Sequence, residues 1–205
     1  MSRGANDDAR TPHVVVEERD TLAVIRINRP EQKNSLSAAT LSDLDEAFTT
    51  LSARDNIKTI IFTGTRDVFA SGADIREFQT LTPDSAREFA RRGQRLFQKL
   101  SDARQLTVAA VNGYCMGGGL DLALACRLRI ASPGAIFAHP GARLGIITGW
   151  GGTQRLPALV GAPLALEMFA TARRMSAREA FEAGLVSHVD TDALGRALEL
   201  ALRHG

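Results

Sequence analysis

Residues 106–126 read LTVAAVNGYCMGGGLDLALAC and combine a strand, a glycine turn and a helix in one short segment. The apolar, β-branched start, LTVAAVNGY, predicts a buried strand. The part after the three glycines, Gly117 to Gly119, is almost entirely apolar and predicts a buried helix. A helix that starts on glycines leaves unpaired backbone N–H groups and a partial positive charge at its N-terminus. The segment therefore predicts a buried strand-to-helix turn that could bind negative charge.

The rest of the chain continues the alternation of strands and helices. Residues 13–30 hold two apolar runs around a charged turn and predict a hairpin, and residues 57–64 predict a buried strand. Ser37 and Thr82 are expected to cap helices, and Ser176 with Glu179 forms a capping box. Further strands are expected at 127–132, 135–139 and 185–189, and further helices at 83–100, 164–170, 176–184 and 192–203. We expect an α/β fold with a mainly parallel sheet: a mobile N-terminal tail, 1–13, and a single domain, 14–205.

Composition narrows the classes of protein that fit. The 205 residues are 44% hydrophobic and 23% charged, with a formal net charge of +2, so no strong field favours a nucleic-acid partner. The first 13 residues lack the apolar core of a signal peptide, and no apolar run approaches the roughly 20 residues that span a bilayer. Cys115 and Cys126 are expected to be buried and reduced, with no metal-like spacing. We expect a cytoplasmic protein without a metal or a membrane contact.

A second glycine turn, SGADI, covers residues 71–75. Gly72 permits an unusual backbone conformation, after which the amides of Ala73 and Asp74 open a short helix. Two such turns that converge on one oxygen would form an oxyanion hole, whereas taken singly each fits glycines that only allow close packing. Neither turn has the Gly-Lys-Ser/Thr of a phosphate loop, and the spacing in GYCMGGG does not fit a dinucleotide fingerprint.

Five segments carry a family resemblance: INRPEQKNSLS, FASGADIREF, AAVNGYCMGGGLDLALACRLRIAS, FAHPGARLGIITGWGGTQRLPALVG and ARRMSAREAFEAGLVSHV. In this order, over residues 21–189, the sequence resembles the enoyl-CoA hydratase/isomerase family, the crotonase superfamily. The resemblance implies a crotonase-like spiral of ββα units. It also implies an acyl-CoA thioester as the substrate, with coenzyme A as part of that substrate and no separate cofactor.

The resemblance also assigns roles to residues. The amides of Ala73 and Gly118 are expected to bind the thioester oxygen, where deprotonation or attack places negative charge, and to stabilise the enolate more than the ground state. Other residues are expected to bind substrate: Asp74, Ile75 and Arg76 at the border of the CoA crevice, and Lys33 and Asn34 near the CoA arm.

The chain departs from the family at the second of its two acids. Asp121 occupies the position of the first acid, although a first-turn aspartate that bonds nearby amides would look the same. Gly141 stands where the second acid belongs, and it is expected to open room for a bulkier acyl group or an anion such as bicarbonate. His139 is a possible proton carrier in its place, since imidazole titrates near working pH; the alternative is a hydrogen-bonded structural histidine. Thr148 and Trp150 could line the acyl pocket, with packing the simpler role for Trp150.

Three functions follow. The first is an enoyl-CoA hydratase that adds water to a trans-2-enoyl-CoA through a stabilised enolate. The second is an enoyl-CoA isomerase, or another proton-transfer enzyme, that uses Asp121 alone. The third, from another class, is a non-catalytic acyl-CoA-binding or assembly protein. Family chains continue with helices beyond the position of Gly205, so the C-terminal helical part is expected to be shortened; a homotrimer or a dimer of trimers is expected if the C-terminus is complete.

Overall fold

The computed structural model describes residues 12–203 and is built on a six-stranded sheet with the order β1-β2-β4-β7-β9-β12. Its strands are β1 (Val14–Arg19), β2 (Leu22–Ile27), β4 (Thr59–Thr63), β7 (Leu106–Val111), β9 (Leu128–Ala131) and β12 (His188–Val189). The strands from β2 to β12 run parallel, and β1 pairs antiparallel with β2. The predicted hairpin and the predicted parallel sheet are both confirmed.

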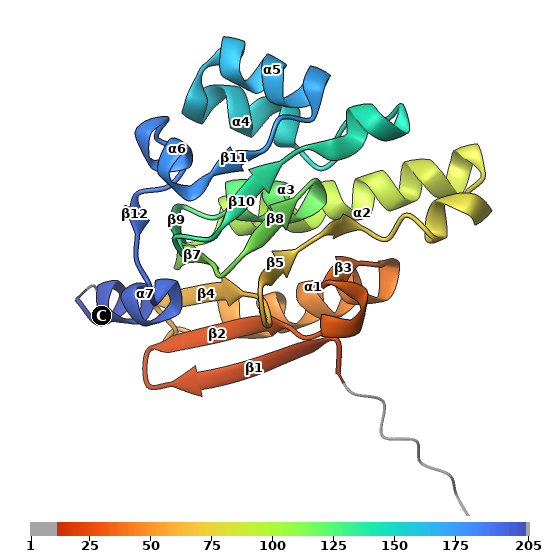
Figure 1. The fold of residues 1–205 in the computed structure, drawn as a ribbon. Helices are drawn as coiled ribbons and strands as arrows, with labels where there is room; N and C mark the ends of the chain where they lie inside the picture. The colour runs from red at the N-terminus through yellow and green to blue at the C-terminus, as the bar shows by residue number, and fades with distance from the viewer. Residues whose placement is uncertain (1–11, 204–205) are drawn as a thin grey trace, which may run out of the picture.

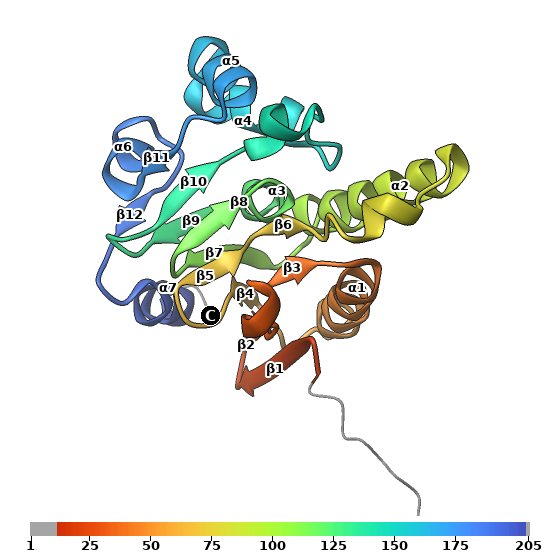
Figure 2. The ribbon, with the colours of Figure 1, turned by 45° about the vertical axis from the view of Figure 1, so that its right-hand side comes forward.

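Short strands form a second layer beside this sheet. One group has the order β11-β10-β8-β5, and β3 pairs with β6. These strands are β3 (Ser35–Leu36), β5 (Val68–Ala70), β6 (Gly72–Ala73), β8 (Tyr114–Met116), β10 (Ile136–Ala138) and β11 (Met175–Ser176). Along the chain, strands β2, β4, β7 and β9 of the large sheet are each followed by one or two short strands and then by a helix (Figures 1 and 2). This repetition of ββα units confirms the predicted crotonase-like spiral.

The helices are α1 (Ala38–Ser52), α2 (Pro83–Ser101), α3 (Gly118–Ala125), α4 (Gly152–Val160), α5 (Ala162–Thr171), α6 (Ala177–Glu182) and α7 (Ala193–Leu202), with 3-10 turns η1 (Pro30–Gln32), η2 (Glu77–Thr80) and η3 (Pro140–Leu144). Three of the helices begin at the caps that the sequence predicts, whereas α3, α4 and α5 begin at glycines without a side-chain cap. Ser37 accepts from the Thr40 amide, and Thr82 accepts from the Ser85 amide. The capping box of Ser176 and Glu179 is present at the start of α6.

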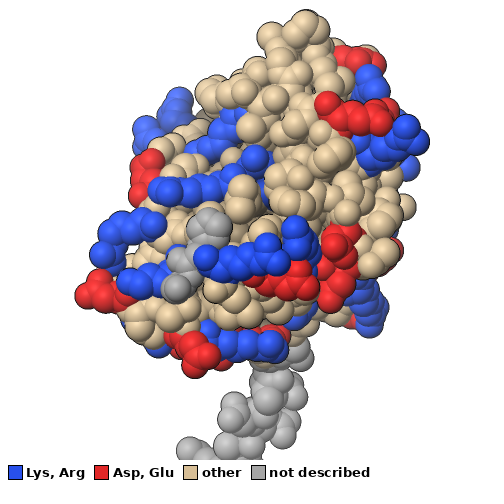
Figure 3. Space-filling model, turned by 90° about the vertical axis from the view of Figure 1, so that its left-hand side faces the viewer, with Lys and Arg blue, Asp and Glu red and all other residues tan. Residues whose placement is uncertain are grey.

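The large sheet is covered on both faces. One face packs against the main core, in which Leu41, Leu44 and Phe48 of α1 are buried as their spacing predicts. The other face is covered by α7 through Ala193, Ala197 and Ala201, because alanines let the helix lie close to Leu22, Val24, Ile61, Val108 and Ile130. Figure 3 shows the side of the molecule that carries this helix, with basic side chains spread over it and acidic ones among them.

Some elements differ from the prediction. The segments that hold β3, β5 and β6 were expected to be loops, and residues 106–114 were expected to be one strand, whereas the chain turns at Asn112 and Gly113 between β7 and β8. Helix α4 was not expected. Strands of two or three residues are too short to show a period-two pattern, and their pairing comes from neighbours distant in sequence.

Two expectations, on the N-terminal tail and on the membrane, can be compared with residues 12–203. Of the predicted tail, residues 1–11 lie outside the described residues, while the carbonyl groups of Pro12 and His13 accept hydrogen bonds from Asn28. No helix in residues 12–203 is long and apolar enough to cross a membrane. The same residues contain no group of three or more acidic, histidine or cysteine side chains that could hold a metal ion.

Gly119→Ala is expected to destabilise the fold by about 1–3 kcal/mol, because an added Cβ at this buried position of α3 would lie 2.3 Å from the Ala70 carbonyl oxygen of β5. Urea unfolding measures the loss. Gly134→Ala is the matched control, since a Cβ there meets no atom within 4 Å. Equal unfolding midpoints for the two variants would contradict the prediction.

Candidate active site

An apolar cavity of about 460 Å³ lies against the start of α3. Five of the predicted site residues line it: Ala73, Ile75, Gly118, His139 and Gly141. Its apolar walls come from Phe78, Phe89, Leu144, Ile146, Ile147 and Trp150, and Thr148 adds a hydroxyl group. The fold thus gathers side chains from residues 73 to 150 around one space that is suited to a hydrocarbon chain.

The two glycine turns meet at the wall of this cavity. Gly72 has φ 98°, and a Cβ added to it would lie 3.1 Å from the Gly118 amide nitrogen; a Cβ added to Gly118 would lie 3.4 Å from the Ala73 nitrogen. The Asp74 amide donates to the Leu36 carbonyl at 3.4 Å, so the preceding amide, that of Ala73, points to the opposite side of the strand.

The Gly118 amide belongs to the first turn of α3. The Asp121 amide donates to the Gly117 carbonyl at 3.0 Å and closes that first turn. The N–H groups of residues 118–120 therefore have no partner within the helix. The amides of Ala73 and Gly118 come from turns that lie side by side, although 45 positions separate the two residues in the sequence.

Asp121 is completely buried behind the cavity and does not line it. The Thr148 hydroxyl donates to its Oδ2 atom, whereas Oδ1 has no hydrogen-bond partner among the described residues. Burial raises the pKa of Asp121 to about 7, against the lowering effects of Thr148, the Trp150 amide and the Arg155 charge. The carboxyl group therefore changes its protonation state near neutral pH.

His139 lies between Asp121 and the cavity. Its Nε2 atom is 3.5 Å from Asp121 Oδ1, and its ring packs against that of Phe169 with the centroids 4.9 Å apart. Neither ring nitrogen has a hydrogen-bond partner among residues 12–203, so no hydrogen bond to these residues fixes the ring. Burial lowers its pKa to about 4, which keeps the imidazole neutral at pH 7.

Gly141 lines the cavity, but the space beyond it is already filled. A Cβ added to Gly141 would lie 2.5 Å from the Ile146 carbonyl oxygen, and the Ile146 amide donates to the Gly141 carbonyl at 3.0 Å. The backbone of the following turn therefore fills the direction in which a side chain at position 141 would point, and the accommodation of a bulkier acyl group or an anion stays a prediction.

The side chains of Asn34 and Asp74 serve the protein itself. Asn34 is completely buried; its Oδ1 accepts from the Arg29 amide at 2.9 Å and its Nδ2 donates to the Val68 carbonyl at 2.7 Å. Asp74 accepts from Arg76 Nε at 2.8 Å, and this hydrogen bond is the main reason why its pKa falls to about 2. Both buried side chains hold the loops that shape the cavity, and the assignment of these two residues to substrate binding stays a prediction.

Lys33 lies at a different cavity, of about 500 Å³, which it lines with Arg66, Tyr114 and Arg174. Ser71 lines both this cavity and the apolar one, so the two are neighbours. Arg76 does not line either cavity; its guanidinium group is exposed and paired with Asp74.

Trp150 has both of the roles that the sequence allows: it is 4% exposed and packs between Phe89 and Phe97, with ring centroids at 5.3 and 5.7 Å, and it also lines the cavity. One contact of the site was not apparent in the sequence. Thr148 was considered only as a wall residue, whereas it binds Asp121 across 27 positions of sequence. One feature of the sequence could have indicated this contact: Thr148 is the one residue in 144–149 whose side chain can form a hydrogen bond.

Comparison with known proteins agrees with this architecture. The family model "Enoyl-CoA hydratase/isomerase" matches residues 17–201. The chain is 42% identical over 178 residues to the crotonyl-CoA hydratase of Syntrophomonas wolfei, covering 86% of this chain and 68% of that protein. It is 36% identical over 192 residues to the short-chain-enoyl-CoA hydratase of Clostridium acetobutylicum, covering 92% of this chain and 74% of that protein.

Among solved structures, an enoyl-CoA hydratase from Bacillus anthracis superimposes with a TM-score of 0.90 at 35% identity, over 94% of this chain and 76% of that chain. This chain is thus shorter than that protein. The family model, the relatives and the fold agree: the chain belongs to the enoyl-CoA hydratase/isomerase family, the crotonase superfamily of enzymes.

Proposed function

We propose that the protein is an enoyl-CoA hydratase, which adds water across the 2,3 double bond of a trans-2-enoyl-CoA. The observation that carries this proposal is the meeting of the Ala73 and Gly118 turns at the wall of an apolar cavity, with the pair of Asp121 and His139 beside it. The names of the relatives support the same reaction.

The oxyanion hole is assigned to the Ala73 and Gly118 amides. When water attacks C3, the thioester becomes an enolate and its oxygen gains negative charge. Donors that are already aligned stabilise this charge more than the neutral carbonyl, which is the condition for catalysis. The partial positive charge at the N-terminus of α3 acts in the same direction.

The proton carrier is assigned to His139 and Asp121 acting together. His139 lines the cavity and Asp121 does not, so the imidazole is the group that touches the reacting atoms. The attacking water bonds to C3 through its hydroxyl and gives one proton to the imidazole, which passes it to the ionised Asp121, 3.5 Å away and the more basic of the two groups. The same proton then returns through the imidazole to C2 of the enolate.

The coenzyme A arm is assigned to the cavity that contains Lys33. Arg66 and Arg174 line it as well, and three cations suit the phosphate groups of coenzyme A. Ser71, which lines this cavity and the apolar one, marks the passage by which the thioester would reach the oxyanion hole. The homotrimer and the cytoplasmic location stay predictions.

A double-bond isomerase is the second candidate. Isomerisation moves one proton and needs only one acid, and Gly141 leaves the chain without the family's second acid. A non-catalytic acyl-CoA-binding protein is the third. In all three cases the acyl chain would occupy the same cavity.

Incubation with crotonyl-CoA is expected to remove the enoyl absorbance and to give a product heavier by one water, because the proposed enolate forms by water attack at C3. Mass spectrometry measures the mass of the product. A 3-enoyl-CoA serves as the comparison substrate: its conversion without a change of mass, together with inert crotonyl-CoA, would favour the isomerase. Binding of both thioesters without turnover would favour the third candidate.

A further inference from the structure

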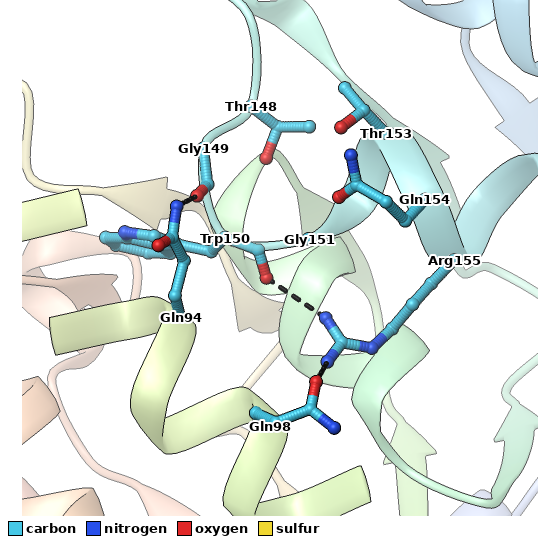
Figure 4. Close-up of a pocket in the computed structure, with 9 residues that line it drawn as sticks. All are labelled: Gln94, Gln98, Thr148, Gly149, Trp150, Gly151, Thr153, Gln154 and Arg155. Atoms are coloured by element: carbon cyan, nitrogen blue, oxygen red, sulfur yellow. Dashed lines mark hydrogen bonds between the residues drawn. The ribbon is translucent and has the colours of Figure 1, made fainter. Parts of the chain in front are cut away.

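A single chain segment, Thr148 to Trp150, separates two cavities. On one side is the apolar cavity of the site, and on the other is a polar cavity of about 460 Å³. Thr148, Gly149 and Trp150 line both. Figure 4 shows the polar side, where Gln94 and Gln98 from α2 face residues 153–155 from α4.

Polar side chains of this second cavity hold the separating segment. Gln94 Nε2 donates to the Gly149 carbonyl at 2.7 Å, and Arg155 Nη1 donates to the Trp150 carbonyl at 3.2 Å (Figure 4). Gln98 Oε1 accepts from Arg155 Nη2 at 3.2 Å. A roomy cavity with several amide and guanidinium groups is a place where water is stable.

The Thr148 hydroxyl joins this wall to the buried acid, since it donates to Asp121 Oδ2. The other charged or titratable groups acting on Asp121 are His139 at the start of η3, Cys115 of β8 and Arg155 of α4. Of these, Cys115 is buried in the core and His139 lies on the apolar side. Trp150 and Arg155 line the polar cavity and also act on Asp121, through a backbone amide and a positive charge, whereas Thr148 places a hydroxyl group between the carboxyl and this cavity.

We propose that Thr148 is a positioning residue that relays protons between Asp121 and water in the polar cavity, so that Asp121 equilibrates with solvent while an acyl chain fills the apolar cavity. A hydroxyl group can accept a proton on one side as it donates one on the other. In the relay, a water molecule gives a proton to Thr148 Oγ1 while the Thr148 proton passes to Asp121 Oδ2; hydroxide leaves to solvent, and the reverse step restores the carboxylate. The inference rests on the proposed function, because that function places the acyl chain in the apolar cavity.

The test measures proton exchange at Asp121 in the whole protein loaded with butyryl-CoA, a saturated thioester that cannot be hydrated. At pH 6 the carboxyl is protonated, since its pKa is about 7, and its C=O stretch shifts when deuterium replaces the proton. Stopped-flow infrared spectroscopy after mixing with D₂O follows this shift, and Asp121→Asn identifies the band by removing it.

Thr148→Val, which keeps the shape without the hydroxyl, is expected to slow the exchange at least tenfold, and Thr148→Ser to restore it to within about twofold. Thr153→Val is the matched control, because Thr153 lines the polar cavity and makes no bond to Asp121. In the wild type, the hydrogen bond from Thr148 lowers the pKa of Asp121. Thr148→Val removes this bond and is therefore expected to raise that pKa and to shift the pH dependence of turnover to higher pH.

Two results would overturn the relay: exchange in Thr148→Val as fast as in the wild type, or equal slowing in Thr153→Val. Measuring crotonyl-CoA turnover on the same samples distinguishes a failure of the proton relay from a failure of the proposed hydratase function. If exchange is slower in Thr148→Val than in the wild type, both with butyryl-CoA bound, but the wild type does not hydrate crotonyl-CoA, only the hydratase proposal is contradicted. If the wild-type protein binds no butyryl-CoA, both the relay and the hydratase proposal are overturned.

Discussion

Asp121→Asn is expected to lower the turnover of crotonyl-CoA by about 10²–10⁴-fold, the range for loss of acid–base assistance. The amide keeps the shape of the carboxyl, so its oxygen still accepts from Thr148 while its NH₂ group faces His139. It cannot accept the proton that His139 passes on from the attacking water. Steady-state kinetics should show the loss in kcat, with the KM for crotonyl-CoA little changed.

The same substitution is expected to change how activity depends on pH. Because Asp121 acts in its ionised form, wild-type turnover should rise with pH through about 7, the pKa that burial gives this carboxyl. The residual activity of Asp121→Asn should lack this rise. A wild-type profile that falls through pH 7 would contradict the assigned role and would favour a protonated Asp121 as the acid.

Stability should move in the opposite direction from activity. The pKa of Asp121 is about 7 in the folded protein and about 4 in the unfolded chain, so between these values the folded state binds one proton more. Stability from this group is then fully present below pH 4 and is lost as pH rises to 7. Relative to wild type, Asp121→Asn should gain about 3 kcal/mol between pH 5 and pH 8, measured by urea unfolding at both values.

Gly118→Ala is expected to reduce turnover by about 10²–10³-fold, the typical effect of losing one oxyanion-hole donor. An added Cβ would lie 2.3 Å from the Trp150 ring, too close for any real contact. Because the indole is held between Phe89 and Phe97, the first turn of α3 is expected to move, and the amide of residue 118 then no longer lies beside that of Ala73. Kinetics with crotonyl-CoA measure the effect, which should fall mainly on kcat.

Gly93→Ala provides the control for displacement of the tryptophan alone. A Cβ on Gly93, which belongs to α2, would lie 2.5 Å from the opposite edge of the Trp150 ring without touching α3. Both variants should lose stability, but Gly93→Ala should keep its activity to within about tenfold. If the two variants lose activity equally, the Gly118 amide has no special role and the oxyanion-hole assignment fails.

The sequence by itself determined the class of fold and the location of its chemistry. Alternation of buried strands with capped helices requires a parallel sheet, because a helix between two strands returns the chain to the same edge. The caps at Ser37, Thr82 and Ser176 could be predicted, since each acts within one turn of its own helix. The same local logic identified both glycine turns, whereas the departure at Gly141 followed from the family resemblance.

Only the tertiary structure decided which of the candidate side chains can act. The family resemblance places Asn34 and Asp74 near the coenzyme A, and only the structure shows that Val68 accepts a hydrogen bond from Asn34 and that both side chains are buried. Asp121 lies behind His139 and Thr148 rather than at the cavity wall. Burial and contacts between distant segments arise when the whole chain packs, and they, more than residue type, set the protonation and reach of each group.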